Sequence, residues 1–355
     1  TMIALQFANV KREPFEIGRP PTNSLLRNPQ LDTIKHLMKD LNILITGGLG
    51  YLGGRIADSL KKNFPETTIT LGTRRKTRDI PNWAESFKII HFDICDSTSI
   101  EKAVIGSDIV IHLAALNEYE SINDIEAAWK TNALGTQALL SSADRKGVQR
   151  FVYFSTFHVY GDCRGTITEN SPAQPHHPYA ATHRAAEDMV RFYQYYKNMD
   201  TLIFRLSNGF GYPMDTGIDR WALVFNDLCR QTVTSGKMVL KSSGKQHRDF
   251  ISLHNVSAAV EHFLFKIQGQ WKDGLYNLGG DESLSIAEAA KTIARVYKKK
   301  HNKTIPIEIN DKKENGPCDP VCFNIDKLKA TGFQLTGDKE MEIEQTLSLC
   351  ENFNT

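Results

Sequence analysis

The sequence has no long hydrophobic run. Its apolar stretches, such as residues 109–111 and 202–204, are interrupted within a few positions by charged residues or histidine, whereas a membrane-spanning helix needs about 20 consecutive apolar residues. A secretory signal consists of a positively charged stretch, an apolar segment and a small-residue cleavage site. Near the start of this sequence, Lys11, Arg12 and Glu13 are not followed by such an apolar segment. We therefore expect a cytoplasmic protein without a membrane-spanning segment.

The sequence also has little net charge and no compact set of cysteines. A net charge of +2 and basic runs no longer than Lys298–Lys300 give no electrostatic reason to expect nucleic acid or a membrane surface as partner. Six cysteines scattered through 355 residues favour free thiols. Cys318 and Cys322 have no second pair nearby, and His176 and His177 lie in a proline-flanked stretch that suits a loop. We expect no metal site.

From residue 41 onward, short β-branched runs alternate with amphipathic segments. Strands are predicted at residues 42–46, 68–71, 88–92, 108–113, 150–155 and 201–206. Helices are predicted at residues 51–63, 97–105, 122–144, 179–197, 221–234 and 285–298. This alternation predicts an α/β fold with a doubly wound parallel sheet, whose ligands bind at the carboxyl ends of the strands.

The first predicted strand runs into a glycine-rich turn that opens a helix. Gly47, Gly50 and Gly53 recur every third residue, and they let a backbone approach phosphates while the helix N-terminus offers free amide groups. Tyr51 and Leu52 lie within the same turn. The position at the first strand-to-helix turn predicts that these five residues bind the pyrophosphate of a dinucleotide.

The second predicted strand ends without the carboxylate expected about 20 residues after the glycine turn. Thr73 is followed instead by Arg74 and Arg75. A carboxylate would repel a 2′-phosphate, whereas guanidinium groups bind one through charge-assisted hydrogen bonds. The sequence therefore favours NADP over NAD as cofactor.

A possible catalytic pair lies at Tyr179 and His183. Residues four apart share one face of a helix, so a phenol and an imidazole there point into the same site. The pattern looks like a catalytic Tyr-x-x-x-Lys helix in which histidine replaces lysine. The fifth predicted strand ends at Ser155 and Thr156, three residues before Val159-Tyr160-Gly161.

Together these motifs resemble the extended short-chain dehydrogenase/reductase superfamily, and in particular the NAD-dependent nucleotide-sugar epimerase/dehydratase family. The resemblance runs from about Leu41 to the C-terminus. Further similar segments are Asp93-Ile94, Leu113-Ala114-Ala115, Asn132-Ala133-Leu134-Gly135-Thr136, Arg248-Asp249-Phe250-Ile251 and Tyr276-Asn277-Leu278-Gly279-Gly280.

The resemblance implies a division of the chain and roles for individual residues. It implies an N-terminal extension (1–40), a Rossmann domain that binds NAD(P) (41–207 plus 251–282) and a smaller lobe for a nucleotide-sugar (208–250 plus 283–355). Cofactor contacts are implied for Asp93, Ile94, Leu113, Ala114, Ala115, Asn132, Tyr179 and His183. Substrate contacts are implied for Asn117, Thr156, Asn208 and Arg248.

Thr156, Tyr179 and His183 are the implied catalytic residues. Tyr179 would exchange a proton with the sugar oxygen while Thr156 hydrogen-bonds that oxygen. Histidine titrates near about 6.5, so His183 lowers the pKa of the tyrosine less than a lysine would unless a partner raises its own pKa. Three interpretations remain open: a working enzyme with a His-tuned tyrosine, a slower enzyme with a shifted pH optimum, and a catalytically silent module that binds NADP.

The resemblance also bears on the reaction. Dehydratases of the family have an acidic pair directly after the catalytic threonine, where this chain has Phe157 and His158, so dehydration is not expected. Reduction of a 4-keto sugar and epimerisation at C4 remain, and the Arg74-Arg75 pair favours the reductase because an epimerase retains its cofactor. Helices 122–144 and 179–197 carry apolar faces that imply a homodimer.

Overall fold

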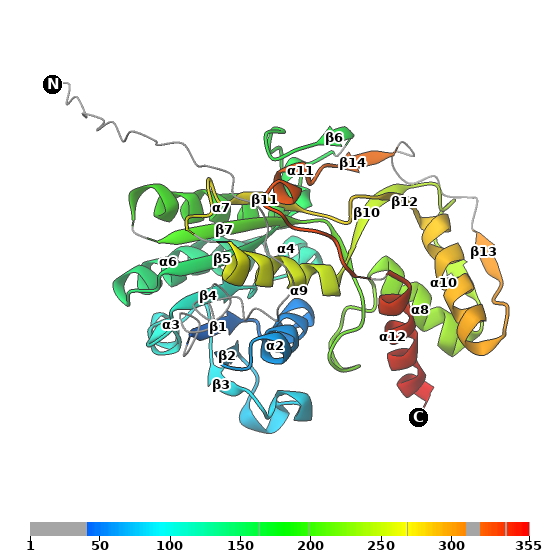
Figure 1. Ribbon diagram of the computed structural model, residues 1–355, viewed down its shortest axis with the longest axis horizontal. Helices are drawn as coiled ribbons and strands as arrows, with labels where there is room; N and C mark the ends of the chain where they lie inside the picture. Colours follow the sequence, from blue (N-terminus) through cyan, green and yellow to red (C-terminus); the bar gives the residue numbers. More distant parts are fainter. Residues whose placement is uncertain are drawn as a thin grey trace, which may run out of the picture. The chain divides into compact units, whose positions relative to one another are not determined.

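Seven parallel strands form the main sheet of the computed structural model (Figure 1). They are β1 (Asn42–Thr46), β2 (Thr68–Thr73), β3 (Lys88–His91), β4 (Ile109–His112), β5 (Arg150–Thr156), β7 (Asp200–Leu206) and β11 (Leu275–Leu278). The structure describes residues 41–162, 164–197, 199–267, 269–309, 320–337 and 339–354. The predicted extension at 1–40 and Cys318 lie outside these ranges.

The strand order is β11-β7-β5-β4-β1-β2-β3. All six predicted strands are present, and β11 is a seventh that the sequence analysis did not assign. The chain leaves β1 toward β2 on one side and returns to β4 on the other, with Ile43 paired to both Ile69 and Ile109. Such a reversal opens a crevice beyond the carboxyl ends of the strands, where dinucleotides bind in doubly wound folds.

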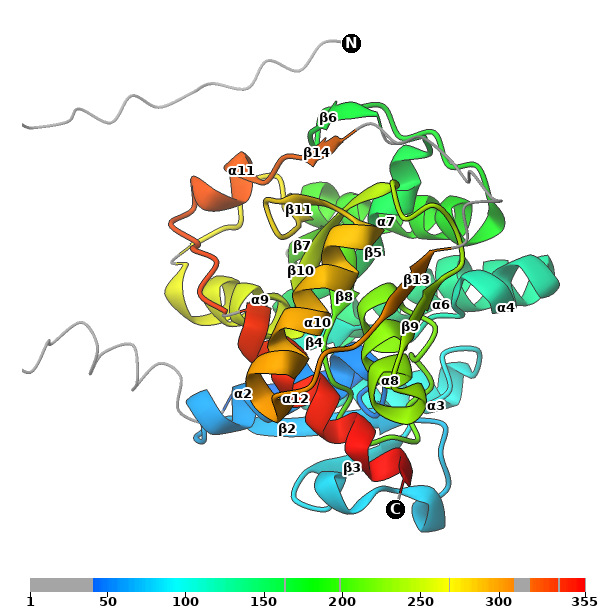
Figure 2. The ribbon, with the colours of Figure 1, turned by 90° about the vertical axis from the view of Figure 1, so that its right-hand side faces the viewer.

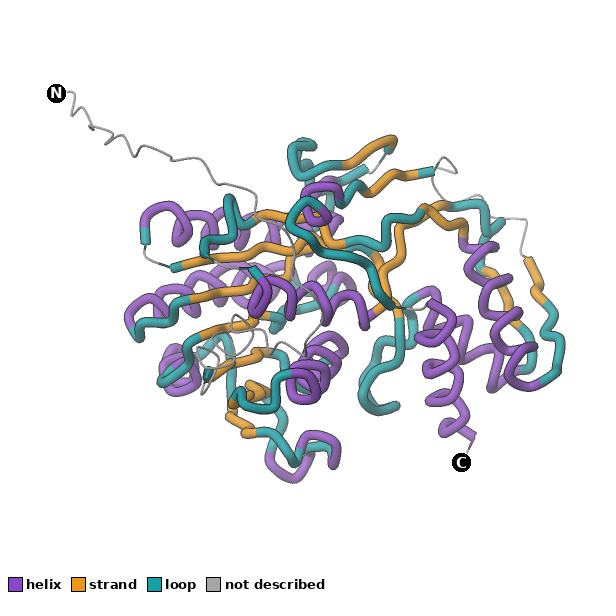
Figure 3. Tube along the Cα trace, in the orientation of Figure 1, coloured by secondary structure: helices purple, strands orange, loops and turns teal. Residues whose placement is uncertain are grey.

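Alternate side chains of each strand pack on opposite faces of the sheet. In β1, Ile43 and Ile45 belong to one apolar cluster and Leu44 to another. The first cluster includes side chains of α2 (Tyr51–Asn63) and α9 (Leu253–Glu261). The second includes those of α3 (Ser97–Val104), α6 (Gly135–Arg145) and α7 (Pro178–Tyr196). Helices therefore cover both faces, as in a Rossmann fold (Figure 3).

The single helix predicted at 122–144 is wrong in detail. The structure has α4 (Glu118–Asn123), α5 (Ile125–Ala128) and the π-helix η3 (Trp129–Leu134) ahead of α6. Asp124 breaks the run because its backbone is extended and its side chain accepts a hydrogen bond from Ala127 N, which caps α5. Of the described helices, none is both long and apolar enough to cross a membrane.

A third apolar cluster lies outside the main sheet. It joins α8 (Val224–Ser235), α10 (Ile286–His301) and α12 (Lys339–Glu351), which lie side by side in Figure 2. The accompanying strands are β8 (Asn208–Phe210), β10 (His247–Ser252) and β12 (Ser283–Ser285) in one sheet, and β9 (Met238–Leu240) with β13 (Ile307–Ile309). We retain the division into two lobes as a proposal.

The remaining elements are short. They are η1 (Thr77–Asp79), η2 (Asn82–Ala84), η4 (Phe157–Tyr160), β6 (Gly165–Ile167), η5 (His262–Lys266), β14 (Val321–Phe323), α11 (Asp326–Lys329) and η6 (Asn352–Asn354). Strand β6 pairs with β14, which connects the loop after β5 with the segment before α11.

Candidate active site

The glycine turn joins β1 to α2 at the crevice of the sheet. Gly47 has a φ of +68°, which L side chains rarely adopt, and a Cβ there would lie 3.1 Å from Ala114 N at the end of β4. A Cβ at Gly53 would overlap Gly47 O. The turn therefore requires glycine at both positions and brings the ends of β1 and β4 close together.

The N-terminus of α2 suits an anionic group. Gly50 at the N-cap makes no side-chain hydrogen bond, and the first turn contains no acidic residue, so its amide groups and the positive end of the helix dipole are unmatched. The side chain of Tyr51 points elsewhere, because its hydroxyl donates to Gly211 O at 2.9 Å. The cradle fits a dinucleotide pyrophosphate held by backbone groups.

The end of β2 presents two cations to solvent. Thr73 is buried and its hydroxyl accepts from Arg75 N at 3.1 Å, while Arg74 and Arg75 are exposed. Neither arginine has an ion pair with a described residue. Both guanidinium groups are thus available beside the strand where the ribose of a dinucleotide lies in this fold.

The ends of β3 and β4 supply small and apolar groups. Ile94 is buried, and Asp93 Oδ1 accepts from Cys95 N at 2.9 Å. Leu113 N and Ala114 N both approach Thr46 Oγ1, at 3.1 and 3.3 Å. Ala115 is exposed, so this edge leaves an open path past the β4 end.

Asn132 and Asn117 have internal partners. Asn132 is buried in η3, where its Oδ1 accepts from Leu116 N at 2.8 Å and its Nδ2 donates to Thr182 Oγ1 at 3.1 Å. Asn117 caps α4, because its Oδ1 accepts from Glu120 N. Asn132 therefore supports the site from behind, and the Asn117 oxygen is engaged in a capping box.

Thr156 and Tyr179 lie together at the end of β5. Thr156 lies close enough to the phenol of Tyr179 to lower its pKa, and Thr156 Oγ1 accepts a hydrogen bond from His158 N at 3.2 Å. The helix that carries Tyr179 begins with Pro178 and is capped by His177, whose Nδ1 accepts from Ala180 N. The structure thus brings together the hydroxyl pair that the sequence predicted.

Burial raises the pKa of Tyr179 above 10. The positive charge of Arg220 and the Thr156 hydrogen bond act in the opposite direction, and Glu118 adds to the increase. Because burial has the largest effect on the pKa of Tyr179, the phenol is protonated at neutral pH. Arg220 comes from the loop before α8, and no sequence motif pointed to it.

His183 is buried beside Tyr179, with the two ring centroids 4.5 Å apart. Its Nδ1 lies 2.7 Å from the hydroxyl of Tyr153 on β5. Burial lowers the pKa of His183 to about 3, and the charge of His158 lowers it further. No partner raises this pKa, so at neutral pH His183 is uncharged and does not supply the cation of a Tyr-x-x-x-Lys pair.

A buried ion pair lies one helical turn beyond His183. Both arms of the Arg205 guanidinium contact the Glu187 carboxylate, at 2.9 and 2.6 Å, and Ser155 Oγ donates to the same carboxylate at 2.6 Å. Glu187 follows Tyr179 and His183 at the same spacing of four, so the sequence did contain this signal. The pair fixes α7 against β5 and β7, which holds Tyr179 in place.

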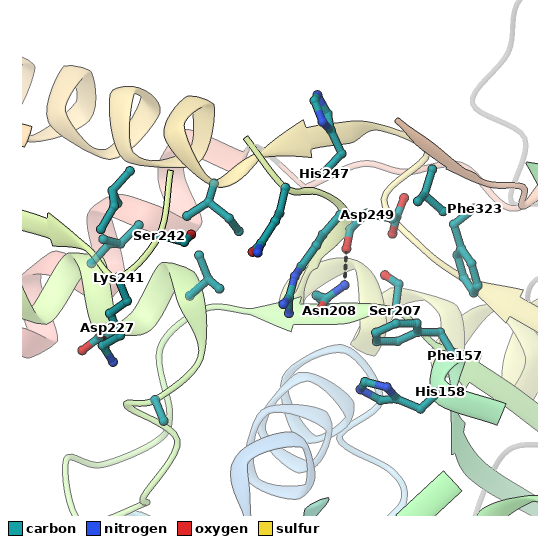
Figure 4. Close-up of a pocket in the computed structure, with 18 of the residues that line it drawn as sticks. Phe157, His158, Ser207, Asn208, Asp227, Lys241, Ser242, His247, Asp249 and Phe323 are labelled. Atoms are coloured by element: carbon teal, nitrogen blue, oxygen red, sulfur yellow. Dashed lines mark hydrogen bonds and ion pairs between the residues drawn. The ribbon is translucent and has the colours of Figure 1, made fainter. Parts of the chain in front are cut away.

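A cavity of about 600 Å³ opens beside Phe157 and His158, which directly follow Thr156 (Figure 4). His158 lines it, and the His158 ring lies 6.2 Å from that of Tyr179. Burial lowers the pKa of His158 to about 4. Arg248 and Lys241 also line the cavity, and Lys241 lies 3.5 Å from Asp227.

The predicted substrate residues Asn208 and Arg248 both line this cavity. Asn208 Nδ2 donates to Asp249 O at 2.8 Å, as Figure 4 shows, which leaves its Oδ1 and the second Nδ2 hydrogen for a ligand. Asp249 is buried and accepts from Gly280 N at 2.8 Å. Burial raises the pKa of Asp249 to about 6. Arg248 is exposed and makes no ion pair within the described part of the chain.

The sequence is similar to that of known proteins. The sequence profile of the NAD-dependent epimerase/dehydratase family matches residues 43–279. The chain belongs to this family. The match spans β1 to the residue after β11, so it includes the glycine turn, Thr156, Tyr179 and His183.

Individual members of the family are similar over most of the chain. The dTDP-D-glucose 4,6-dehydratase of Mus musculus is 29% identical over 277 residues, 74% of each protein. The dTDP-glucose 4,6-dehydratase of Streptomyces niveus is 28% identical, over 72% of this chain and 77% of that protein.

Solved structures of the family confirm the fold. The UDP-N-acetylglucosamine 4-epimerase of Methanobrevibacter ruminantium superposes with a TM-score of 0.74 at 24% identity, over 88% of this chain and 98% of that one. The UDP-glucuronic acid 4-epimerase of Bacillus cereus, in complex with UDP-glucuronic acid and NAD, gives 0.71 at 21% identity, over 88% and 100%.

Proposed function

We propose that the protein is an NAD(P)-dependent oxidoreductase that acts on a nucleotide-diphosphate sugar at C4, and that it reduces a 4-keto sugar. The observation that carries this proposal is the phenol of Tyr179, which burial keeps protonated, beside Thr156 and packed against an uncharged His183. Reduction of a ketone requires a proton donor at the ketone oxygen, whereas oxidation of an alcohol requires a base. A phenol with a raised pKa is poised for the first task.

Each residue of the site has a defined role in this proposal. The dinucleotide, when bound, supplies the hydride for the carbonyl carbon. Thr156 hydrogen-bonds the carbonyl oxygen and orients it toward Tyr179. The Tyr179 hydroxyl gives its proton to that oxygen, and water then reprotonates the phenolate.

Arg74 and Arg75 support NADP as the preferred cofactor, since they are exposed cations at the end of β2 with no ion pair in the described residues. Structural neighbours are complexes with NAD, so NAD remains the alternative. A reductase consumes its reduced cofactor at each turnover and so benefits from selecting the NADPH pool.

The cavity beyond His158 supports a nucleotide-diphosphate sugar as substrate. Its volume of about 600 Å³ lies within the usual range for small-molecule sites. Arg248 offers an exposed guanidinium fork for a diphosphate. Relatives of this chain act on dTDP-glucose, and structural neighbours bind UDP-sugars.

The test is to incubate purified protein and NADPH with a panel of 4-keto nucleotide sugars and to follow loss of NADPH absorbance. Consumption that requires one of these sugars supports the reductase. Binding of NADPH with no oxidation by any sugar in the panel would instead identify a catalytically silent module.

A 4-epimerase is the second candidate, because structural neighbours include 4-epimerases of UDP-sugars. The two reactions differ in their pH dependence. An epimerase first oxidises its sugar and needs the Tyr179 phenolate, so its rate should rise about tenfold per pH unit between pH 7 and 9. A reductase uses the phenol and should be nearly independent of pH in that range. Interconversion of UDP-glucose and UDP-galactose without net cofactor consumption would establish the epimerase.

We also propose a homodimer formed through an apolar face of η3 and α7. Trp129 is 43% exposed, and Phe192 and Met189 are 43% and 38% exposed. The two elements pack against each other, so we expect these exposed apolar side chains to contribute to one interface. A second copy of the chain would bury it.

A further inference from the structure

Tyr153 and His183 form a hydrogen-bonded pair that no sequence motif indicated. The Tyr153 hydroxyl on β5 lies 2.7 Å from His183 Nδ1 on α7, and each side chain is only 3% exposed. Tyr153 has no other hydrogen-bond partner in the described residues. The bond therefore joins the central sheet directly to the catalytic helix.

The donor in this bond can be assigned. Burial raises the pKa of Tyr153 well above 10, so its oxygen keeps its proton. Burial lowers the pKa of His183 to about 3, so the ring carries only one proton. The hydroxyl is assigned as the donor to Nδ1, because an Nδ1–H donor would leave both the Tyr153 hydroxyl proton and the Nε2 lone pair without a partner among the described residues. The ring proton of His183 is on Nε2.

The Nε2 atom of His183 is buried and has no hydrogen-bond partner among the described residues. An unmatched buried donor is costly, and most such groups in native proteins have a partner. His183 lies next to Tyr179 and replaces the family lysine, on the helix that borders the cofactor crevice. The unmatched N–H therefore points to a ligand that offers a hydrogen-bond acceptor.

We propose that Tyr153 is a positioning residue that holds His183 in its Nε2–H tautomer, so that a neutral N–H donor binds a ribose hydroxyl at the nicotinamide end of the cofactor. This inference rests on the proposed dinucleotide-dependent function. It explains how the site can hold the cofactor ribose without the lysine cation of the family. The alternative is a purely structural role, in which Tyr153 only packs between β5 and α7.

Several titratable groups surround the imidazole. The ring of Tyr179, on α7, packs against the His183 ring. His158, on η4, lowers the pKa of His183 through its charge. His183 in turn lowers the pKa of His112, on β4. Glu187 acts on Tyr153 through its charge. None of these groups hydrogen-bonds His183 Nε2, so among the described residues Tyr153 alone determines the tautomer.

The first test is direct. Nitrogen-15 NMR of full-length protein labelled at histidine, with the His183 signals assigned from a His183→Gln variant, should show Nε2 protonated and Nδ1 unprotonated at pH 7. In Tyr153→Phe, which removes the hydroxyl and retains the ring, a second tautomer should appear. Tyr276→Phe removes a buried hydroxyl from the same sheet, on β11, and should leave the His183 signals unchanged. Retention of the pure Nε2–H form in Tyr153→Phe overturns the proposal.

The second test measures NADPH affinity by fluorescence. Tyr153→Phe should weaken binding about 2- to 10-fold, the range expected when one neutral hydrogen bond is lost. The same Tyr153→Phe substitution is then made in a His183→Lys background, where the ammonium group has no tautomers. There the change in the logarithm of the NADPH dissociation constant should be less than about half of that in the wild-type background. An equal loss in both backgrounds assigns Tyr153 a packing role and refutes positioning.

These measurements are independent of the proposed reaction. If the tautomer and affinity results hold and no 4-keto sugar is reduced, the proposed reductase activity fails and the role of Tyr153 stands. If a sugar is reduced but Tyr153→Phe changes neither the tautomer nor the affinity, the positioning role fails alone. The pH profile of turnover adds a third readout. A mixture of His183 tautomers in Tyr153→Phe should change the rate by the same factor at every pH, and the part of the profile that reports titration of Tyr179 should stay at the same pH.

Discussion

Arg55 and Glu342 form a two-armed buried ion pair although 287 residues separate them in sequence. The guanidinium nitrogens lie 2.5 and 3.1 Å from the carboxylate oxygens. Arg55 belongs to α2, which follows the glycine turn, and Glu342 to α12 at the end of the chain. Arg55 also donates to Tyr212 O at 2.9 Å. The pair thus connects the helix that would hold the pyrophosphate to the proposed substrate lobe.

Removing one partner of this ion pair should destabilise the protein. Glu342→Gln leaves the Arg55 charge buried without a counter-ion, and we expect a loss of about 3 kcal/mol in the free energy of unfolding. Urea unfolding followed by circular dichroism measures it. Glu344→Gln, an exposed change on the same helix, is the matched control and should have little effect. Equal stability of the two variants would contradict the role of the pair.

Tyr179→Phe should abolish most of the activity while the protein still binds its cofactor. The change removes the proton donor and retains the ring, and loss of a general acid costs about 10²- to 10⁴-fold in rate. Steady-state NADPH oxidation with the best sugar of the panel gives kcat, and fluorescence titration gives the NADPH affinity. Tyr195→Phe, on an exposed part of α7, serves as control. A kcat of Tyr179→Phe within a few-fold of wild type would remove Tyr179 from the mechanism.

Replacing Arg74 and Arg75 together by alanine should reduce selectivity for NADPH over NADH. Charge-assisted hydrogen bonds to a 2′-phosphate contribute about 1.5–3 kcal/mol, so we expect a 10- to 100-fold loss for NADPH and little change for NADH. Arg78→Ala is the control, since Arg78 is also exposed and lies 3.6 Å from Asp79. If the double variant binds both cofactors as wild type does, NADP preference has another source or is absent.

The buried His112 should make stability depend on acid pH. Burial lowers the pKa of His112 to about 3, from 6.5 in the unfolded chain, and the charge of His183 adds to this. The unfolded state therefore binds an extra proton between pH 6.5 and 3, so this contribution is complete above pH 6.5 and is lost as pH falls through the window. His112→Gln should reduce the slope of unfolding free energy against pH by up to about 1.4 kcal/mol per unit.

Urea titrations at pH 4, 5 and 6 measure this slope. His112→Gln also breaks hydrogen bonds to Thr46 and Thr136, so its stability should be lower at every pH, and the slope is the decisive quantity. His91→Gln, at an exposed position on β3, should keep the wild-type slope. An unchanged slope in His112→Gln would show that this imidazole does not resist protonation.

Trp129→Glu should convert the proposed dimer to a monomer. The substitution places a charge on the apolar face of η3 and α7, where burial of an unpaired carboxylate is costly. Sedimentation velocity at several concentrations measures the mass. Ile309→Glu, which alters an equally exposed apolar residue on β13, should leave the mass unchanged. A wild-type monomer at all concentrations would refute the dimer itself.

Much of the fold followed from local patterns. Helix 51–63 and strand 42–46 were predicted with the bounds that the structure has, because hydrophobic periodicity and the glycine turn act over neighbouring residues. The helix at 122–144 failed because one aspartate cap and a π-turn interrupt an otherwise continuous apolar pattern. Strand β11 was missed because its four residues carry too short a pattern to distinguish from a loop.

The site was predictable to the extent that its residues lie on motifs. Thr156 and Tyr179 were both assigned in advance, and the structure places Thr156 close enough to affect the pKa of the Tyr179 phenol. Asn132 was assigned to the cofactor, yet its amide is occupied by Leu116 and Thr182. That outcome depends on which side chains surround the amide, and sequence spacing does not report it.

The sequence by itself indicated the family, the glycine cradle and a histidine at the position where the family pattern has lysine. Only the tertiary structure decided what this replacement means. The charge of an imidazole depends on solvation and on its hydrogen-bond partner, and both come from residues remote along the chain: Tyr153 lies 30 positions away, and burial requires the whole sheet and helix layer to assemble. For that reason the same four-residue spacing that suggested a cation beside Tyr179 holds a neutral donor in the folded protein.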